Sequence, residues 1–147
     1  GACKGSGQIP AENWQPYSPP QFVTPPFPGY VSGHSTVSGA CSKMLELFTG
    51  SDDFGSYYVQ RAGMYTEDGC PPPSMQAKNA IPAANPGNQE VVLRMPTFTA
   101  TAEMAGISRI MGGYHIQADN TAGLELGRNV ATFSWPKYQA YFDGTAR

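Results

Sequence analysis

The chain has only two histidines, His34 and His115, and each stands among small and polar residues. Ser32 and Gly33 precede His34, at the point where a proline-rich stretch gives way to a helical pattern. A helix N-terminus presents N–H groups without intrahelical acceptors, glycine lets the backbone approach a bound oxygen, and serine adds a hydroxyl donor. The segment therefore predicts an anion site. A serine N-cap followed by a surface histidine is the alternative that this short pattern leaves open.

Arg109, His115 and Asp119 form the second group of residues suited to chemistry. The arginine offers a planar fork of donors that matches an oxyanion. Asp119 follows His115 by four residues, so the two side chains would share a face if the backbone is helical there. A carboxylate in that place fixes the imidazole tautomer and leaves the other ring nitrogen for chemistry. The alternative is that Asp119 only caps a helix and that Arg109 is solvated.

Three parts of the chain have apolar residues at helical spacing, which predicts a mainly helical fold. The expected helices run from about 35 to 48, closed by Gly50; from Thr97 to the interruption at Gly112–Gly113; and from about 119–121 toward Tyr141. Pro136 should bend the third helix or split it at Ser134 or Trp135, because proline lacks the N–H that a helix interior needs.

Each predicted helix has apolar side chains that are candidates for the core. They are Val37, Cys41, Met44, Leu45 and Phe48 in the first; Ala100, Met104, Ile107 and Ile110 or Met111 in the second; and Leu124, Val130, Phe133 and Tyr138 in the third.

The remaining segments read mostly as irregular structure. Residues 1–31 are rich in proline and predict an extended arm or loop. Residues 54–64 fit either a strand or a short helix, and Glu90–Leu93 is a short apolar run ended by Met95–Pro96. Residues 66–89 form a long loop, and such loops often lie over a binding site. We expect one domain over 1–147, with the arm at 1–31 and a helical, site-bearing part at 32–147.

Composition excludes several kinds of partner. The formal net charge of −2 and the pI near 5.6 do not indicate the basic surface that nucleic-acid binding requires. No apolar run approaches the roughly 20 residues of a membrane span. Gly1–Gly7 has no signal-peptide character, so we expect any targeting segment to be removed or to lie outside this chain.

The three cysteines, Cys3, Cys41 and Cys70, have no CxxC spacing, so a zinc or redox motif has no support. One disulfide with a free thiol, or a bond to a partner chain, both remain open. The low charged fraction of 14% and the many prolines favour a secreted or periplasmic protein.

Together the two histidine segments resemble the vanadium haloperoxidases and the related acid phosphatases, which carry P-S-G-H followed by S-R-x5-H-x3-D. Ser108–Asp119 matches the second motif in full, and Val31–His34 matches the first with valine in place of proline. Trp14–Tyr17, Phe22–Phe27 and Gly123–Arg128 are similar to bacterial-type haloperoxidases. The resemblance implies a C-terminal part of such a protein, folded as an incomplete helical bundle with long Pro/Gly-rich loops.

The resemblance also implies roles for the individual residues. His115 would bind the vanadium of vanadate through a ring nitrogen, or attack phosphorus in a phosphatase, and Asp119 would orient it. Ser32 and Gly33 would hold oxygens of vanadate, or of phosphate in its place, and Arg109 would offset their charge. His34 would be the acid–base group. Phe27 stands where haloperoxidases place a residue near the halide pocket, although simple packing of a proline-rich loop is the favoured explanation.

One family motif, K-x6-R-P, is absent, because Ala11 stands where the arginine would follow Lys4. Arg94, Arg128 and Lys4 are candidate substitutes. An oxyanion needs several cations once it is desolvated, so we expect the N-terminal part of the same protein, or another chain, to supply them. A homo-oligomer is also open.

Three functions follow from this reading. The first is a vanadate-dependent haloperoxidase that oxidises halide with hydrogen peroxide. The second is an acid phosphatase with a phosphohistidine intermediate. The third is a non-catalytic structural or assembly domain that keeps the fold.

Overall fold

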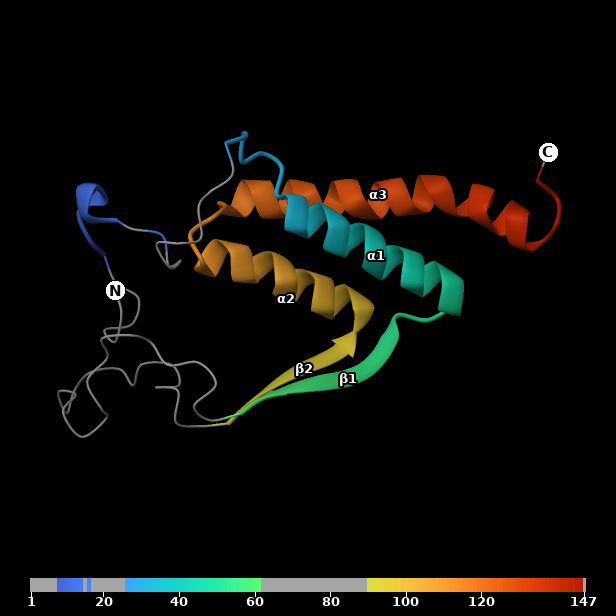
Figure 1. The fold of residues 1–147 in the computed structure, drawn as a ribbon, viewed down its shortest axis with the longest axis horizontal. Helices are drawn as coiled ribbons and strands as arrows, with labels where there is room; N and C mark the ends of the chain where they lie inside the picture. The colour runs from blue at the N-terminus through green and yellow to red at the C-terminus, as the bar shows by residue number, and fades with distance from the viewer. Residues whose placement is uncertain (1–7, 15, 17–25, 62–89, 147) are drawn as a thin grey trace. The chain divides into compact units, whose positions relative to one another are not determined.

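The computed structural model describes residues 8–14, 16, 26–61 and 90–146. The elements in order are a 3-10 helix η1 (Ala11–Asn13), α1 (Gly33–Thr49), β1 (Asp53–Gln60), β2 (Val91–Thr97), α2 (Phe98–Met111) and α3 (Gln117–Phe142), as Figure 1 shows. The predicted, mainly helical fold class is confirmed. The long loop expected at 66–89 lies outside the described residues, as do Lys4, Cys3 and Cys70.

The chain divides into two compact units. One unit comprises Gly1–Trp14 and Tyr57–Arg94, and the other comprises Gln15–Ser56 and Met95–Arg147. Helices α1, α2 and α3 all belong to the second unit. The packing and the site described below are therefore those of the second unit.

The two strands form a two-stranded sheet. β1 settles the choice left open for residues 54–64 in favour of a strand over its described part. β2 continues through Pro96, so the prediction that Met95–Pro96 ends this run was wrong. Each strand of a two-stranded sheet has one unpaired edge, and proline is tolerated where its missing N–H would face away from the partner.

Helix α1 begins at the junction where the anion site was predicted. Ser32 is its N-cap, and its Oγ accepts a hydrogen bond of 3.3 Å from the backbone N–H of Ser35. At the other end Gly50 adopts the left-handed conformation with φ of 76°, which glycine tolerates without steric cost. The predicted start and stop of this helix are confirmed to within two residues.

Helix α2 is capped from two sides. Thr97 Oγ1 accepts from the N–H of Ala100 over 2.9 Å, as expected for a helix that begins after Thr97. Asp52, from the turn after α1, accepts from the N–H of Thr99 over 2.9 Å and from its hydroxyl over 3.1 Å. These bonds tie the start of α2 to the end of α1.

Helix α3 starts at Gln117, slightly before the predicted start, and it is not split at Pro136. Proline removes the N–H that would bond the carbonyl of Thr132, and both residues are exposed. Water can therefore satisfy that carbonyl, which explains why the helix continues through the proline.

Small residues form the interface between α1 and its neighbours. A Cβ added to Gly123 of α3 would lie 2.8 Å from the carbonyl oxygen of Ser32, and one added to Gly127 would collide with the carbonyl oxygen of Thr36. The buried residues of the described part are mostly small as well: Ser32, Ser35, Gly39, Ser42, Ala102, Gly106, Asn120, Gly123, Gly127 and Ala131. α1 and α3 therefore approach closely at their backbones.

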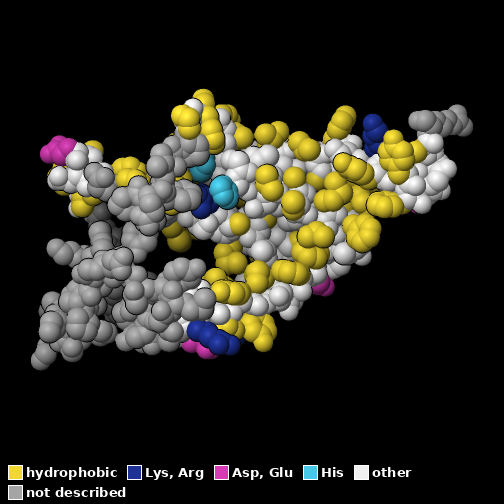
Figure 2. Space-filling view, in the orientation of Figure 1, with side chains coloured by type: hydrophobic (Ala, Val, Ile, Leu, Met, Phe, Trp, Pro, Cys, Tyr) yellow, Lys and Arg dark blue, Asp and Glu magenta, His cyan; other side chains and the backbone are white. Residues whose placement is uncertain are grey.

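The larger apolar side chains predicted for the core are mostly exposed. Leu124 is buried as expected, but Val37, Phe48 and Val130 are exposed and Phe133 is 89% exposed. Figure 2 shows such side chains spread over the visible face of the helices. The core prediction was wrong for these positions because helical spacing identifies an apolar stripe, whereas burial requires an element to cover it. None of the helices in the described part of the chain combines the length and the apolar character that a membrane crossing requires.

Candidate oxyanion site

The best-defined part of the site is the pair formed by His115 and Asp119. His115 Nδ1 lies 3.1 Å from Asp119 Oδ2, and each side chain is only 13% exposed. A carboxylate that is largely removed from water needs partners, and an imidazole N–H is a suitable one. This contact favours the tautomer with its proton on Nδ1. The Nε2 lone pair is then available for chemistry.

Asp119 also caps helix α3. Its Oδ2 accepts a second hydrogen bond, of 3.3 Å, from the backbone N–H of Ile116. His115 precedes the helix, so the helical backbone that a shared face would require is not present at this residue. The turn that leads into α3 brings the imidazole onto the capping carboxylate. Capping and histidine orientation, which the sequence posed as alternatives, therefore occur together.

The loop before α1 packs directly against this pair. The backbone N–H of Ser32 donates to the carbonyl oxygen of Asp119 over 3.1 Å. A Cβ built on Gly29 would lie 3.6 Å from Asp119 Oδ2 and 3.8 Å from His115 Nδ1. Gly29 thus lies beside the hydrogen bond between His115 and Asp119.

His34 lies close enough to Arg109 and His115 for these residues to influence its pKa. Its partial burial lowers the pKa of the His34 imidazole below its ordinary value, and the positive charges of Arg109 and His115 lower it further. In Figure 2 the two histidine side chains, in cyan, lie close together beside a cationic side chain. The structure therefore brings both predicted histidines and the predicted arginine into one neighbourhood.

Arg109 occupies the last turn of α2, where a cation is favoured by the helix dipole. Its Cζ lies 4.2 Å from the centroid of the Tyr114 ring. Its Nε is one of two buried side-chain N or O atoms in the described part of the chain that have no hydrogen-bond partner, the other being Gln60 Nε2. An unsatisfied buried donor on a cation is the feature that a bound oxyanion would complete.

Ser32 and Gly33 stand at the start of α1. Ser32 has no exposed surface, and its Oγ serves as the cap acceptor. An accepting hydroxyl still has its own proton to donate. Gly33 is exposed, and a Cβ built on it would meet nothing within 4 Å. By helix geometry the N–H groups of Gly33 and His34 have no intrahelical acceptor.

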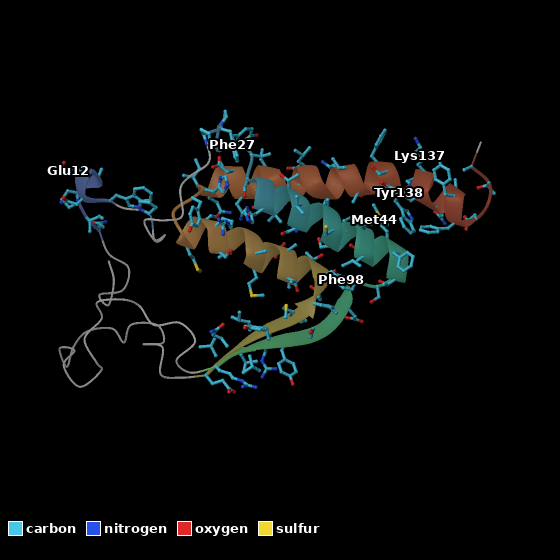
Figure 3. The ribbon with its side chains drawn as sticks, viewed as in Figure 1. Glu12, Phe27, Met44, Phe98, Lys137 and Tyr138 are labelled. Atoms are coloured by element: carbon cyan, nitrogen blue, oxygen red, sulfur yellow. The ribbon has the colours of Figure 1, made fainter. Side chains whose placement is uncertain are left out.

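Two other predicted positions lie apart from these contacts. Phe27 is 69% exposed in the loop before α1, and Figure 3 shows where it lies. Its place near a halide pocket stays a prediction. Arg128, a candidate substitute cation, is bound to Glu103 at 3.0 Å, so its charge is already compensated.

Sequence reasoning missed a polar contact that joins the helices beside the site. Ser35 Oγ donates to Asn120 Oδ1 over 2.7 Å, and both residues are buried. A Cβ on Gly106 of α2 would collide with the same Asn120 oxygen, so this bond lies where the three helices meet. The neighbouring motif residues were the only signal in the sequence, since Asn120 follows Asp119 directly.

The donor set fits an oxyanion better than a bare metal ion. Within the described residues, no group of three or more His, Cys, Asp or Glu side chains could hold a metal ion. What converges instead is one imidazole with a free ring nitrogen, an arginine with an unsatisfied donor and the start of a helix. Such a set can bind a tetrahedral or trigonal oxyanion such as vanadate or phosphate.

Comparison with known proteins agrees with the motifs. The family model described as the VCPO second helical-bundle domain matches residues 1–144. A search of curated proteins finds no significant match.

Several solved structures share the fold. A holo-type bacterial vanadium-dependent chloroperoxidase aligns with a TM-score of 0.63 and 22% identity, over 90% of this chain and 25% of that chain. The apo-type bacterial vanadium-dependent chloroperoxidase gives 0.56 and 21%, over 73% and 20%. A bacterial vanadium-dependent iodoperoxidase gives 0.52 and 30%, over 85% and 23%. The chain thus spans a quarter or less of the length of these proteins. Since the family model matches nearly all of its residues, the chain belongs to the VCPO second helical-bundle domain family, the vanadium haloperoxidase group that its motifs indicated.

Proposed function

We propose that this chain forms the histidine-bearing half of the active site of a vanadate-dependent haloperoxidase, an enzyme that oxidises halide with hydrogen peroxide. The proposal rests on one observation. The His115 imidazole is oriented by Asp119, and the charges of His115 and Arg109 both act on His34. Arg109 also has a buried donor without a partner among the described residues. Each of these groups belongs to one of the two motifs, and the fold brings them together from three different elements.

In this proposal His115 would hold the vanadium of vanadate through Nε2. Asp119 accepts from Nδ1, keeps the lone pair on Nε2 and restrains the ring. Both side chains of this pair are only 13% exposed, so water has little access to the contact. Asp119 is itself fixed by the N–H groups of Ile116 and Ser32, which reach its side chain and its backbone carbonyl respectively.

Vanadate oxygens would be held by Arg109, by the Ser32 hydroxyl and by the N–H of Gly33. Arg109 has a buried donor to offer, and the start of α1 adds the positive end of its dipole. When bound, vanadate would supply the Lewis-acidic centre at which peroxide is activated toward halide. Phosphate has the same shape and would occupy the same donors.

His34 is proposed as the acid–base group. Its lowered pKa keeps the imidazole neutral near neutral pH, so it can accept a proton from an incoming peroxide. A bound oxyanion adds negative charge beside it and would raise its pKa again. The anion would thus stabilise the protonated form of His34 after it has taken up the proton.

The site needs further cations. Within the described residues Arg109 is the arginine whose charge acts on His34, and Arg128 is held by Glu103. Vanadate carries roughly two negative charges, and buried charge must be compensated. We therefore propose that the N-terminal part of the same protein, or another chain, supplies a lysine and an arginine. The solved relatives are about four times longer than the part that this chain matches, which agrees with this.

The exposed apolar faces of the helices support the same conclusion. On α1, Val37, Leu45 and Phe48 follow helical spacing and are 63%, 44% and 64% exposed. On α3, Val130 and Phe133 are also exposed. Apolar faces of this kind mark surfaces that other elements cover. Further helices of a bundle would bury them.

The experiment is a vanadate titration of the 147-residue chain, alone and together with the segment that carries the missing cations. We expect weak binding by the chain alone, and tight binding with halide-dependent peroxidase turnover for the combination. His115→Ala should abolish vanadate binding, whereas His34→Ala should spare binding and remove turnover. Equal loss of binding in both variants would reject the separate roles.

Two other outcomes would revise the proposal. Tight vanadate binding and turnover by the chain alone would remove the need for a partner segment. Cleavage of phosphate esters that vanadate inhibits, without any halide oxidation, would identify a phosphatase instead.

A further inference from the structure

Among the residues that the structure describes, the partner of the Arg109 guanidinium is an aromatic ring and not a carboxylate. Its guanidinium carbon lies 4.2 Å from the centroid of the Tyr114 ring, which is the geometry of a cation–π contact. Arg128, in the same unit, has the opposite arrangement, because Glu103 binds it at 3.0 Å. The two arginines are thus fixed in different ways, with different consequences for their charge.

The backbone after α2 is built to place this ring. Gly113 has a φ of 76°, a left-handed conformation that reverses the chain, and the N–H of Tyr114 donates to the carbonyl of Arg109 over 3.0 Å. A Cβ on Gly112 would collide with the Tyr114 ring and lie 2.7 Å from its Cδ2. Any larger residue at position 112 would force the ring to shift.

The type of partner determines what Arg109 can do. A carboxylate would hold the guanidinium but would also compensate its charge and occupy its N–H donors. An aromatic face attracts the cation from one side and leaves the N–H groups, which lie in the guanidinium plane, available to an anion. The unsatisfied Nε of Arg109 agrees with this, since it is buried and has no partner among the described residues.

We infer that Tyr114 is a positioning residue of the oxyanion site: it holds Arg109 over its ring and thereby keeps the donors and the charge of that arginine available to the ligand. The inference rests on the proposed function, because it assigns to Arg109 an oxyanion ligand. Tyr114 itself does not need to touch that ligand.

The test uses inorganic phosphate, titrated into the 147-residue chain together with the segment that carries the missing cations and followed by ³¹P and protein NMR. Tyr114→Leu removes the ring face and should weaken phosphate binding by about 2- to 30-fold, the range of a cation–π contact. Tyr114→Phe keeps the ring and should restore affinity to within about 2-fold of wild type. Tyr138→Leu, a matched change at an exposed position of α3, should leave phosphate binding unchanged.

A second measurement does not depend on ligand binding or on any change at Tyr114. The Nε–H proton of Arg109 should resonate upfield of that of Arg128 in the wild-type chain, because it lies over an aromatic face. Arg109→Lys identifies the signal.

The outcomes separate the two proposals. No phosphate binding by wild type, or binding that Arg109→Ala leaves unchanged, would reject the oxyanion site and the inference with it. Wild-type affinity in Tyr114→Leu, equal losses in the Leu and Phe variants, or an Nε–H proton that is not shifted upfield would overturn the role of Tyr114 alone.

Discussion

The backbone N–H of Ser32 donates a hydrogen bond of 3.1 Å to the backbone carbonyl of Asp119. This bond joins the cap residue of α1 to the first turn of α3, so it connects the two motifs directly. Because it is made by main-chain atoms, neither residue type is required for it. The side chains of the two motifs are then placed by the geometry of two helix starts, which is more rigid than a pair of loops.

Asp119 should show two separable roles. Asp119→Ala removes the acceptor for both Ile116 N–H and His115 Nδ1, so it should lower the free energy of unfolding by about 0.5–2 kcal/mol and weaken phosphate binding. Asp119→Asn keeps an acceptor oxygen for the cap but loses the charge that orients His115. Its stability in urea unfolding should therefore stay near wild type while phosphate binding falls. An Asn variant that is as unstable as the Ala variant would contradict the capping role.

The pKa of His34 should respond to its neighbours. Partial burial and the charges of Arg109 and His115 lower it, so in NMR titration His34 should titrate below its ordinary value of 6.5. Arg109→Gln removes one positive charge and should raise the pKa. Inorganic phosphate should raise it as well, because an anion favours the protonated ring.

The same shift has a consequence for stability. The unfolded chain binds a proton at His34 at higher pH than the folded chain does, so the contribution of His34 to folding is present above the unfolded pKa and is lost as pH falls through the folded one. Urea unfolding of wild type and His34→Ala between pH 7 and pH 5 measures this difference.

The prediction for the pKa itself has its own contradicting outcome. A His34 pKa that does not move in Arg109→Gln would show that the two groups are not close in solution.

The close approach of α1 and α3 should be sensitive to a single methyl group. Gly127→Ala places a Cβ against the carbonyl oxygen of Thr36, so one helix must shift. We expect a loss of about 1–3 kcal/mol in the free energy of unfolding, as for other overpacked interfaces. Glu125→Ala, at an exposed position of the same helix, is the control and should change stability little. Equal stability of the two variants would contradict the observed packing.

Local features of the fold were predictable from the sequence. The helix starts near Ser32 and Thr97 and the stop at Gly50 were predicted to within two residues, because caps and stops act through their own backbone neighbours. The continuity of α3 through Pro136 was not recognised, since it depends on whether the freed carbonyl is exposed to water.

The sequence indicated which residues to consider for the candidate site but only partly how they are arranged. Arg109, His115 and Asp119 were identified as a set by their spacing, yet the contact between His115 and Asp119 arises from a turn and not from a shared helical face. The place of Tyr114 was not predictable, because nothing in its own stretch of sequence shows that the chain folds its ring back against Arg109.

The sequence by itself determined where the helices begin, which residue types could bind an oxyanion and which family the motifs resemble. Only the tertiary structure decided which helix faces are buried. The buried positions include the small residues Gly39, Gly123 and Gly127, whereas most of the larger apolar side chains are exposed. The reason is physical: caps, turns and helical spacing act between neighbours in the chain. Burial and the partner of a charge depend instead on which distant segment packs against each face.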